Sequence, residues 1–182
     1  MEQLLVRYCS PTLAGIKTAG LFNYAFSDKD GLERSLAACG RLLNGKGVFI
    51  EALKVEGFRA LLYVYRKSRL EEDLRKDGVP EFLSRYGYRS GAAADCLAHL
   101  KRRFDAGGEF PHEIGIFLGY PLEDVTGFIE NAGQNSKCIG CWKVYSDEYT
   151  ATALFEKYKK CRCIYEKMFS CGRSVSQLTV AA

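Results

Sequence analysis

The sequence predicts an α+β fold: a mostly helical single domain with a short β-hairpin or small sheet and an αα-corner. With 182 residues, 47% of them hydrophobic and 26% charged, the chain suits one globular core. Several segments carry apolar residues at helical spacing, and one pair of neighbouring segments has the composition of strands. No repeat or low-complexity linker divides the chain. We therefore expect one domain over residues 1–173 and a frayed tail over residues 174–182.

The N-terminal part begins with a short apolar run, LLVRYC (4–9), which we interpret as a strand. Ser10 and Pro11 follow as an N-cap and a first helical residue, so a short helix, PTLAGIKTAGLF, is expected next. The next helix, about residues 29–43, is indicated by an apolar stripe: Leu32, Leu36, Cys39 and Leu43.

The middle of the chain contains the clearest strand signal. The runs GKGVFIEAL and FRALLYVYR are rich in β-branched and aromatic residues, and Gly57 suits the turn between them. A β-hairpin is therefore predicted over about residues 47–53 and 58–65. Helical sequence follows at 68–77, from Pro80, and at 91–105.

The segment HEIGIFLGYPLEDVTGFI (112–129) predicts two short helices joined by a tight turn. Pro111 and Pro121 suit first helical positions, and Gly119 suits the turn. The carboxylates of Glu123 and Asp124, in the first turn of the second helix, are expected to contribute about 0.3–1 kcal/mol each through the helix dipole.

The spacing of this segment resembles the helix-turn-helix of DNA-binding repressors, but its charge argues against DNA binding. Protein–DNA affinity rests largely on neutralising phosphates. Residues 109–130 contain no Lys or Arg and five acidic residues, namely Glu109, Glu113, Glu123, Asp124 and Glu130. A packed αα-corner is the favoured interpretation.

The C-terminal part is basic. WKVYS (142–146) is a short strand candidate, and residues 147–169 form the longest predicted helix. Residues 137–173 hold eight Lys or Arg and four Asp or Glu, so this segment alone accounts for the net charge of +4.

The eight cysteines predict reduced thiols rather than a disulfide framework, because the N-terminus lacks the pattern of a signal peptide. Cys39 lies on an apolar helical stripe and is expected to be buried. Cys138 and Cys141 form a C-x-x-C motif. Cys161 and Cys163 fall within a helix, where positions two apart point about 200° apart, so no stable four-cysteine metal site is expected.

Cys9 is the candidate nucleophile, because a thiol between a strand and a capped helix has a lowered pKa. His112 is the candidate general base, with Glu113 or Asp124 as the carboxylate that orients it. Lys17, further along the predicted helix, is a candidate to bind an anionic group of the substrate.

Two other functions stay open. One is a non-catalytic interaction or regulatory module, with an acidic corner and a basic C-terminal helix. The other is a metal or redox protein that uses Cys138 and Cys141. We expect a cytoplasmic protein with no membrane partner and with a protein or small molecule as its partner. The residues identify neither cofactor nor substrate.

Three stretches together resemble a bacterial domain family of unknown function: YCSPTLAGIKTAGLF (8–22), HEIGIFLGYPLEDVTGFI (112–129) and CIGCWKVYSD (138–147). The resemblance covers about residues 5–170. It implies a small, stand-alone cytoplasmic protein and supplies no activity, cofactor or catalytic residue. In the family pattern an aromatic residue stands at the position of Cys141, which argues against a shared metal site there.

Overall fold

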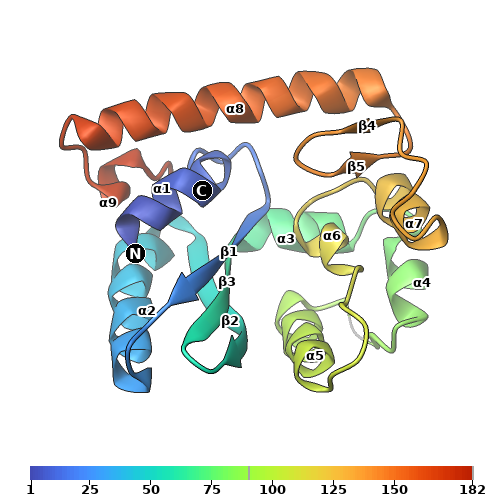
Figure 1. The fold of residues 1–182 in the computed structure, drawn as a ribbon, viewed down its shortest axis with the longest axis horizontal. Helices are drawn as coiled ribbons and strands as arrows, with labels where there is room; N and C mark the ends of the chain where they lie inside the picture. Colours follow the sequence, from blue (N-terminus) through green and yellow to red (C-terminus); the bar gives the residue numbers. More distant parts are fainter. Residues whose placement is uncertain (90, 182) are drawn as a thin grey trace.

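A computed structural model describes residues 1–89 and 91–181 of the chain (Figure 1). The helices are α1 (Glu2–Leu13), α2 (Lys29–Leu43), α3 (Lys67–Leu74), α4 (Val79–Ser84), α5 (Ala93–Asp105), α6 (Ile114–Phe117), α7 (Leu122–Glu130), α8 (Glu148–Ser170) and α9 (Val175–Leu178), with a 3-10 turn, η1, at Asn44–Lys46. The strands are β1 (Ala19–Ala25), β2 (Val48–Glu56), β3 (Arg59–Arg66), β4 (Cys138–Ile139) and β5 (Lys143–Val144). The predicted α+β domain, mostly helical, is confirmed.

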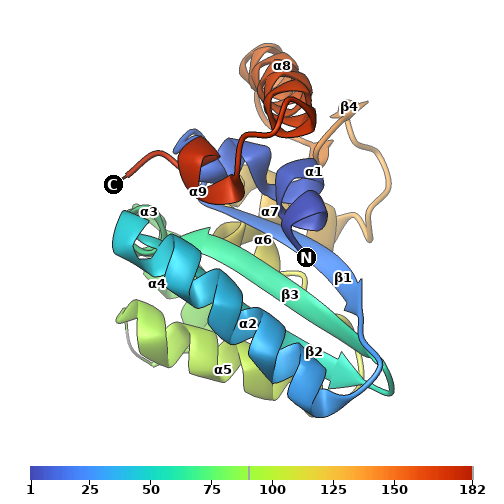
Figure 2. The ribbon, with the colours of Figure 1, turned by 90° about the vertical axis from the view of Figure 1, so that its left-hand side faces the viewer.

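A central antiparallel sheet, in the order β1–β3–β2, divides the core into two layers. Successive side chains of β3 point to opposite faces, as in any strand. Ala60, Leu62 and Val64 pack with α1, α2 and α9. Tyr63 and Tyr65 pack on the other face, with apolar residues of α3 to α7. The sheet is therefore covered on both faces, with α1 and α9 on one side and α5 on the other (Figure 2).

The expected strand at residues 4–9 is wrong, because this segment belongs to α1. A short apolar run does not distinguish a buried strand from the buried face of a helix. The buried apolar positions recur at helical spacing: Leu5, Val6, Cys9 and Leu13. Ser10 does not cap a new helix, because its hydroxyl donates back to the carbonyl of Val6 within α1.

The expected helix PTLAGIKTAGLF is also wrong, because α1 ends in a glycine turn and the chain continues as β1. Gly15 has φ +75°, and the amide of Ile16 donates to the carbonyl of Pro11 (2.9 Å), which closes the helix end. The buried Arg66 of β3 donates to the last two carbonyls of α1 (2.6 and 2.7 Å). A cation at a helix C-terminus is favourable, so Arg66 stabilises the end of α1.

The helix at residues 29–43 and the β-hairpin are confirmed as α2 and β2–β3. Asp28 caps α2 by accepting a hydrogen bond from the amide of Gly31 (2.7 Å). Gly57 occupies the hairpin turn with φ +56°, a conformation that glycine adopts without strain.

Residues 112–129 form the two short packed helices that the sequence predicts, α6 and α7. The first begins at Ile114 rather than at Pro111, because residues 111–113 form a preceding turn. A Cβ atom on Gly115 would lie 2.6 Å from Cγ2 of Val125, so the absent side chain lets the helices approach closely.

The turn between α6 and α7 packs against β1 and β3. Gly119 has φ +77°, and a Cβ atom there would lie 2.6 Å from Oγ1 of Thr18. The hydroxyl of Tyr63, in β3, donates to the carbonyl of Phe117 (2.5 Å). This corner is therefore held on the sheet by backbone conformation, close packing and a buried hydrogen bond.

The longest helix, α8, lies across α1 and the β4–β5 hairpin (Figure 1). Asp147 caps it, accepting from the amide of Thr150 (3.1 Å). Beneath its N-terminal half, Trp142, Val144 and Tyr158 belong to a separate small core cluster. The hairpin is thus enclosed between α8 and α7.

The expected frayed tail at residues 174–182 is wrong over the part that the structure describes. A capping box at Ser174 begins α9, and Val175 and Leu178 are buried against α1 and α2. The amide of Val180 donates to the last carbonyl of α1 (3.0 Å). Residue 182 lies outside the described residues.

Candidate functional site

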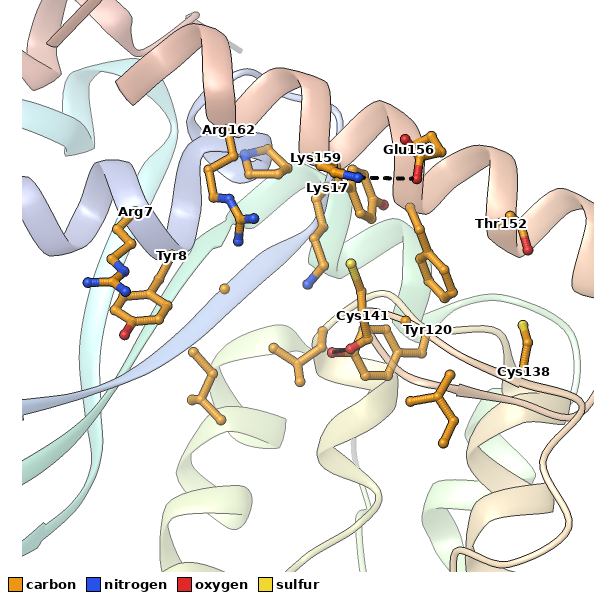
Figure 3. A pocket seen from close by; sticks show the side chains of 18 of the residues that line it. Arg7, Tyr8, Lys17, Tyr120, Cys138, Cys141, Thr152, Glu156, Lys159 and Arg162 are labelled. Atoms are coloured by element: carbon orange, nitrogen blue, oxygen red, sulfur yellow. Dashed lines mark hydrogen bonds and ion pairs between the residues drawn. The ribbon is translucent and has the colours of Figure 1, made fainter. Parts of the chain in front are cut away.

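A cleft of about 900 Å³ lies beneath α8, bounded by α1, β1 and the β4–β5 hairpin (Figure 3). We call it the α8 cleft. Its charged lining is mostly basic, with Arg7, Lys17, Lys159 and Arg162 against Glu148 and Glu156. The remaining walls are largely apolar and aromatic, with Tyr8, Leu21, Leu118, Tyr120, Phe155 and Tyr158 among them.

Lys17 enters the cleft from the turn between α1 and β1. Its ammonium donates to the carbonyl of Ala19 and lies 5.1 Å from the ring centroid of Tyr120. Burial lowers the pKa of Lys17 to about 8, with nearby thiol and carboxyl groups partly opposing the shift. Within residues 1–89 and 91–181, no carboxylate forms an ion pair with Lys17. Asp73 therefore acts on Lys17 only at longer range, without an ion-pair contact.

Arg162, from α8, reaches toward the same space as Lys17, whereas the guanidinium of Arg7, from α1, lies beyond Tyr8, 5.6 Å from the centroid of its ring (Figure 3). Neither arginine has an acidic partner among the described side chains. Lys159 differs, because Glu156 lies 3.9 Å away on the exposed surface of α8. Lys17 and Arg162, from distant parts of the sequence, thus face one space without an ion-pair partner among the described residues.

The thiols of Cys138 and Cys141 line the cleft from the β4–β5 hairpin. Burial raises the pKa of Cys141, although the charges of Lys17 and Arg162 oppose the shift, so this thiol keeps its proton at neutral pH. In the described part of the chain, no group of three or more His, Cys, Asp or Glu is placed to hold a metal ion. The expected absence of a metal site stays a prediction.

Cys9 does not occupy the position expected of an activated thiol. It lies inside α1 rather than before a helix N-terminus, and its side chain is 0% exposed. The sulfur faces β1 so closely that a Cβ atom on Gly20 would lie 2.7 Å away. Burial raises the pKa of Cys9 to about 12, with Lys17 partly opposing the shift. The expected lowering of the Cys9 pKa is wrong because no helix N-terminus or free amide stabilises the thiolate at this position.

His112 is not brought together with Cys9. Its ring is exposed and packs between Phe110 (5.4 Å between centroids) and Phe128 (4.9 Å). His112 lines a second cavity, which Cys9 does not line. The arrangement that was expected for a thiol nucleophile and its base is therefore not formed by these two residues.

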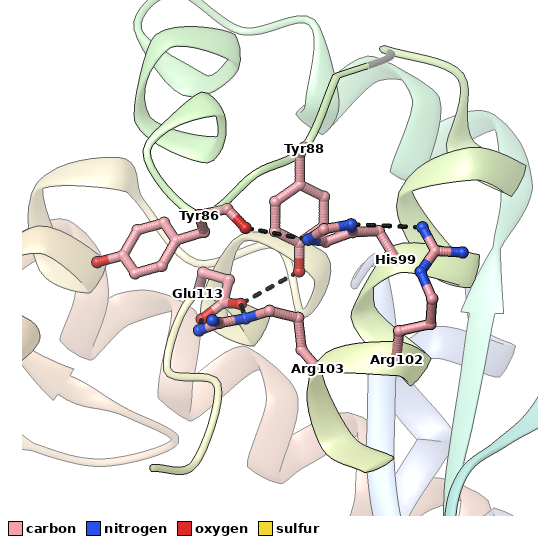
Figure 4. A network of polar contacts seen from close by, with 6 residues as sticks. All are labelled: Tyr86, Tyr88, His99, Arg102, Arg103 and Glu113. Carbon is pink, nitrogen blue, oxygen red and sulfur yellow. Dashed lines mark hydrogen bonds and ion pairs between the residues drawn. The ribbon is translucent and has the colours of Figure 1, made fainter. Parts of the chain in front are cut away.

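Glu113 is buried and belongs to a network of polar contacts with residues of α5 and of the segment before it (Figure 4). Its carboxylate accepts from Nε of Arg103 (2.8 Å) and from the hydroxyl of Tyr88 (3.2 Å). Beside it, Nε2 of His99 lies 3.0 Å from the carbonyl of Tyr86. These contacts join α5 to the corner, so the position of Glu113 is explained by structure and not by the orientation of a catalytic base.

Asp124 ties α7 to the β4–β5 hairpin. Its carboxylate accepts from Nε1 of Trp142 (2.7 Å), from the amide of Tyr145 (2.7 Å), and from the amide and hydroxyl of Ser146 (both 2.8 Å). Burial opposes ionisation, but these hydrogen bonds together lower the pKa of Asp124. Asp124 is thus an ionised structural anchor for the wall of the α8 cleft.

Sequence reasoning identified Lys17 but missed Arg162 and Tyr120 as neighbours of Lys17. The excess of basic residues in the C-terminal part was a signal for α8, but it did not show which cation faces inward. That depends on the rotation of α8 about its axis, which packing against α1 and the hairpin decides.

No helix in residues 1–89 and 91–181 combines the length and the apolar character that crossing a bilayer requires. Neither a curated protein nor a solved structure matches the chain at a significant level. One protein family does match, over residues 5–179, and its description is "Protein of unknown function (DUF3793)". Because the match covers nearly the whole sequence, the chain belongs to this family.

Proposed function

We propose that the α8 cleft binds a small anionic molecule, and that Lys17 and Arg162 hold its negatively charged group. The observation that carries this proposal is that Lys17 and Arg162 reach into one cleft and neither forms an ion pair within the described chain. This is the non-catalytic binding alternative that the sequence left open, with a small molecule as the partner. The burial of Cys9 and the raised pKa of its thiol do not support a thiol enzyme that uses this residue.

The lowered pKa of Lys17 supports the proposal. A partly buried ammonium without an ion-pair partner costs free energy, because one carbonyl and one aromatic ring replace its hydration only in part. A bound anion would supply that partner. At about 4 Å, two opposite unit charges near a protein surface attract each other by about 4 kcal/mol, which is enough to offset much of this cost.

The types of cation also support the proposal. The guanidinium of Arg162 offers a planar pair of donors that matches the oxygens of a carboxylate or phosphate. Lys17 adds a compact charge, held in place by the carbonyl of Ala19 and the ring of Tyr120. The two come from different elements, so a ligand between them would bridge α8 and the turn before β1.

The test is isothermal titration calorimetry with inorganic phosphate, sulfate and acetate. We expect at least one of these anions to bind, and Arg162→Met to weaken binding about tenfold, the loss typical of one charge-assisted hydrogen bond. Lys160→Met is the matched control. It removes one positive charge from the same helix, two residues away, but Lys160 does not line the cleft.

Lys160→Met should change the affinity less than about twofold, because long-range charge effects are screened at physiological salt. Equal losses in the two variants would show that binding follows net charge and not the cleft. Failure of all three anions to bind the wild-type protein would contradict the proposal directly.

A further inference from the structure

A second cavity, of about 320 Å³, adjoins the α8 cleft. It extends from the β4–β5 hairpin to the αα-corner, where Phe110 and Phe128 form part of its wall. The two spaces have lining residues in common: Leu21, Leu118, Tyr120, Ile139, Gly140 and Cys141. The two cavities are therefore adjacent, so a ligand that fills both would be elongated.

The second cavity offers apolar surface but few unused polar groups. All of the hydrogen bonds that Asp124 accepts come from the neighbouring hairpin. Lys143 donates to the carbonyl of Gly133 (2.6 Å), and the ring of His112 packs against Phe128. A group that enters this space is stabilised by burial of apolar surface and not by hydrogen bonds.

Apolar side chains stand exposed at the edges of this space. Ile139, which lines both cavities, is 72% exposed, and Phe110 is 50% exposed. An apolar ligand group between them would remove part of their surface from water. The cationic cleft thus continues into a space whose walls suit a hydrocarbon or a ring.

We propose that the ligand is an amphipathic anion: a carboxylate or phosphate held at Lys17 and Arg162, with an alkyl or aryl group in the second cavity. This inference rests on the proposed anion site and adds the chemical class of the ligand. The ligand is a dissolved molecule and not a lipid within a bilayer, because its charged group must pass beneath α8 to reach Lys17.

The chain contains one tryptophan, Trp142, which allows a direct test. Trp142 lines the second cavity and is 9% exposed, with the ring of Tyr120 stacked at 4.6 Å. The probes are inorganic phosphate and then methyl, butyl, hexyl and octyl phosphate, below their micellar concentrations. Affinity is measured by calorimetry and the environment of Trp142 by its fluorescence emission.

We expect the affinity to rise roughly threefold with each added methylene until the second cavity is filled. Only the longer alkyl phosphates should shift the emission of Trp142. Phe110→Ser should flatten the dependence on chain length while leaving the affinity for inorganic phosphate unchanged. Phe58→Ser is the matched control, because Phe58 is similarly exposed (67%) and lines neither cavity.

The outcomes separate this inference from the proposed function. If inorganic phosphate and all alkyl phosphates bind with equal affinity and leave Trp142 unchanged, the anion site stands and the amphipathic ligand is overturned. If hexanol binds as tightly as hexyl phosphate, the cavity takes apolar molecules without an anion, which also overturns the inference. If no phosphate binds, both proposals fail. Binding to anionic phospholipid vesicles without binding of the dissolved compounds would overturn the choice of a dissolved ligand.

Discussion

The αα-corner and the α8 cleft both hold buried or partly buried charges, but only the corner neutralises them. In the corner, Glu113 is paired with Arg103, and Asp124 accepts hydrogen bonds from the hairpin. In the cleft, Lys17 contacts a carbonyl and an aromatic ring but forms no ion pair with an acid among the described residues. A satisfied buried charge is explained by the fold, whereas an uncompensated one indicates a partner outside the chain.

This difference makes the two regions separable by experiment. Substitutions in the corner should lower stability, and substitutions of cations in the cleft should lower ligand affinity without lowering stability.

The largest loss of stability is expected at the turn of the corner. Gly119→Val should lower the free energy of unfolding by about 3–5 kcal/mol, because it adds strain at a positive φ and a clash with Thr18. Gly57→Val is the control, since its φ is also positive but nothing lies within 4 Å of an added Cβ atom. It should cost only the strain, about 1–2 kcal/mol. Urea unfolding measures both, and equal losses would contradict the role of the clash.

Asp124→Ala should lower the free energy of unfolding by about 2–4 kcal/mol, because it leaves donors of the hairpin without a partner. The effect depends on pH. The pKa of Asp124 is lowered in the folded state, so its contribution is present above the unfolded pKa of about 3.9 and is lost as the pH falls through the folded value. Urea unfolding of both proteins from pH 7 to pH 2 should show their difference shrinking at low pH. A difference in unfolding free energy that stays constant from pH 7 to pH 2 would contradict the role of Asp124 as an ionised hydrogen-bond acceptor.

Lys17→Met should weaken binding of the anion about tenfold or more and leave the melting temperature unchanged or higher, because the partly buried charge is held at a cost. In the wild-type protein, affinity should fall as the pH rises through about 8, where Lys17 loses its proton. Cys9 and Cys141 stay protonated in that range, since burial raises the pKa of both. Calorimetry from pH 6 to pH 10 measures this, and a pH-independent affinity would contradict the role of Lys17.

The smallest expected effect on the protein comes from chemical labelling of its thiols in the folded state. Cys163 and Cys171, which are exposed, should react with iodoacetamide before the buried Cys9, Cys39 and Cys96. Mass spectrometry of limited digests identifies the modified positions. Early modification of Cys9 would show that α1 opens readily, and it would restore the thiol to the set of candidate functional groups.

Much of the fold was predictable where local signals agreed with one another. The helix α2 has both an apolar stripe and a capping aspartate, and the turn at Gly119 has proline on its C-terminal side. The prediction for the N-terminal part was wrong because a serine followed by a proline is typical of a helix start. In the structure Ser10 and Pro11 lie near the end of α1. The turn at Gly15 ends α1, and the last carbonyls of the helix are satisfied by the side chain of Arg66, which is distant in sequence.

The candidate site was predictable only in part for the same reason. Lys17 was identified from its place after Cys9, but Arg162 comes from α8 and meets Lys17 only through tertiary packing. The position of Asp124 in the first turn of α7 predicted a favourable interaction with the helix dipole. Nothing in the neighbouring sequence predicted that the hairpin would donate hydrogen bonds to its carboxylate.

The hydrogen bonds of Arg66 have a consequence for the order of folding. One guanidinium nitrogen donates to the carbonyls of Leu13 and Val180 (both 2.7 Å), so a strand at the centre of the sheet joins two segments more than 160 residues apart in sequence. Contacts of such separation carry a large loop-closure entropy, and they form after local hairpins and helices. During synthesis the apolar face of α1 can therefore pack on β3 once that strand has emerged, but the contacts of α1 with α9 wait until nearly the whole chain has followed.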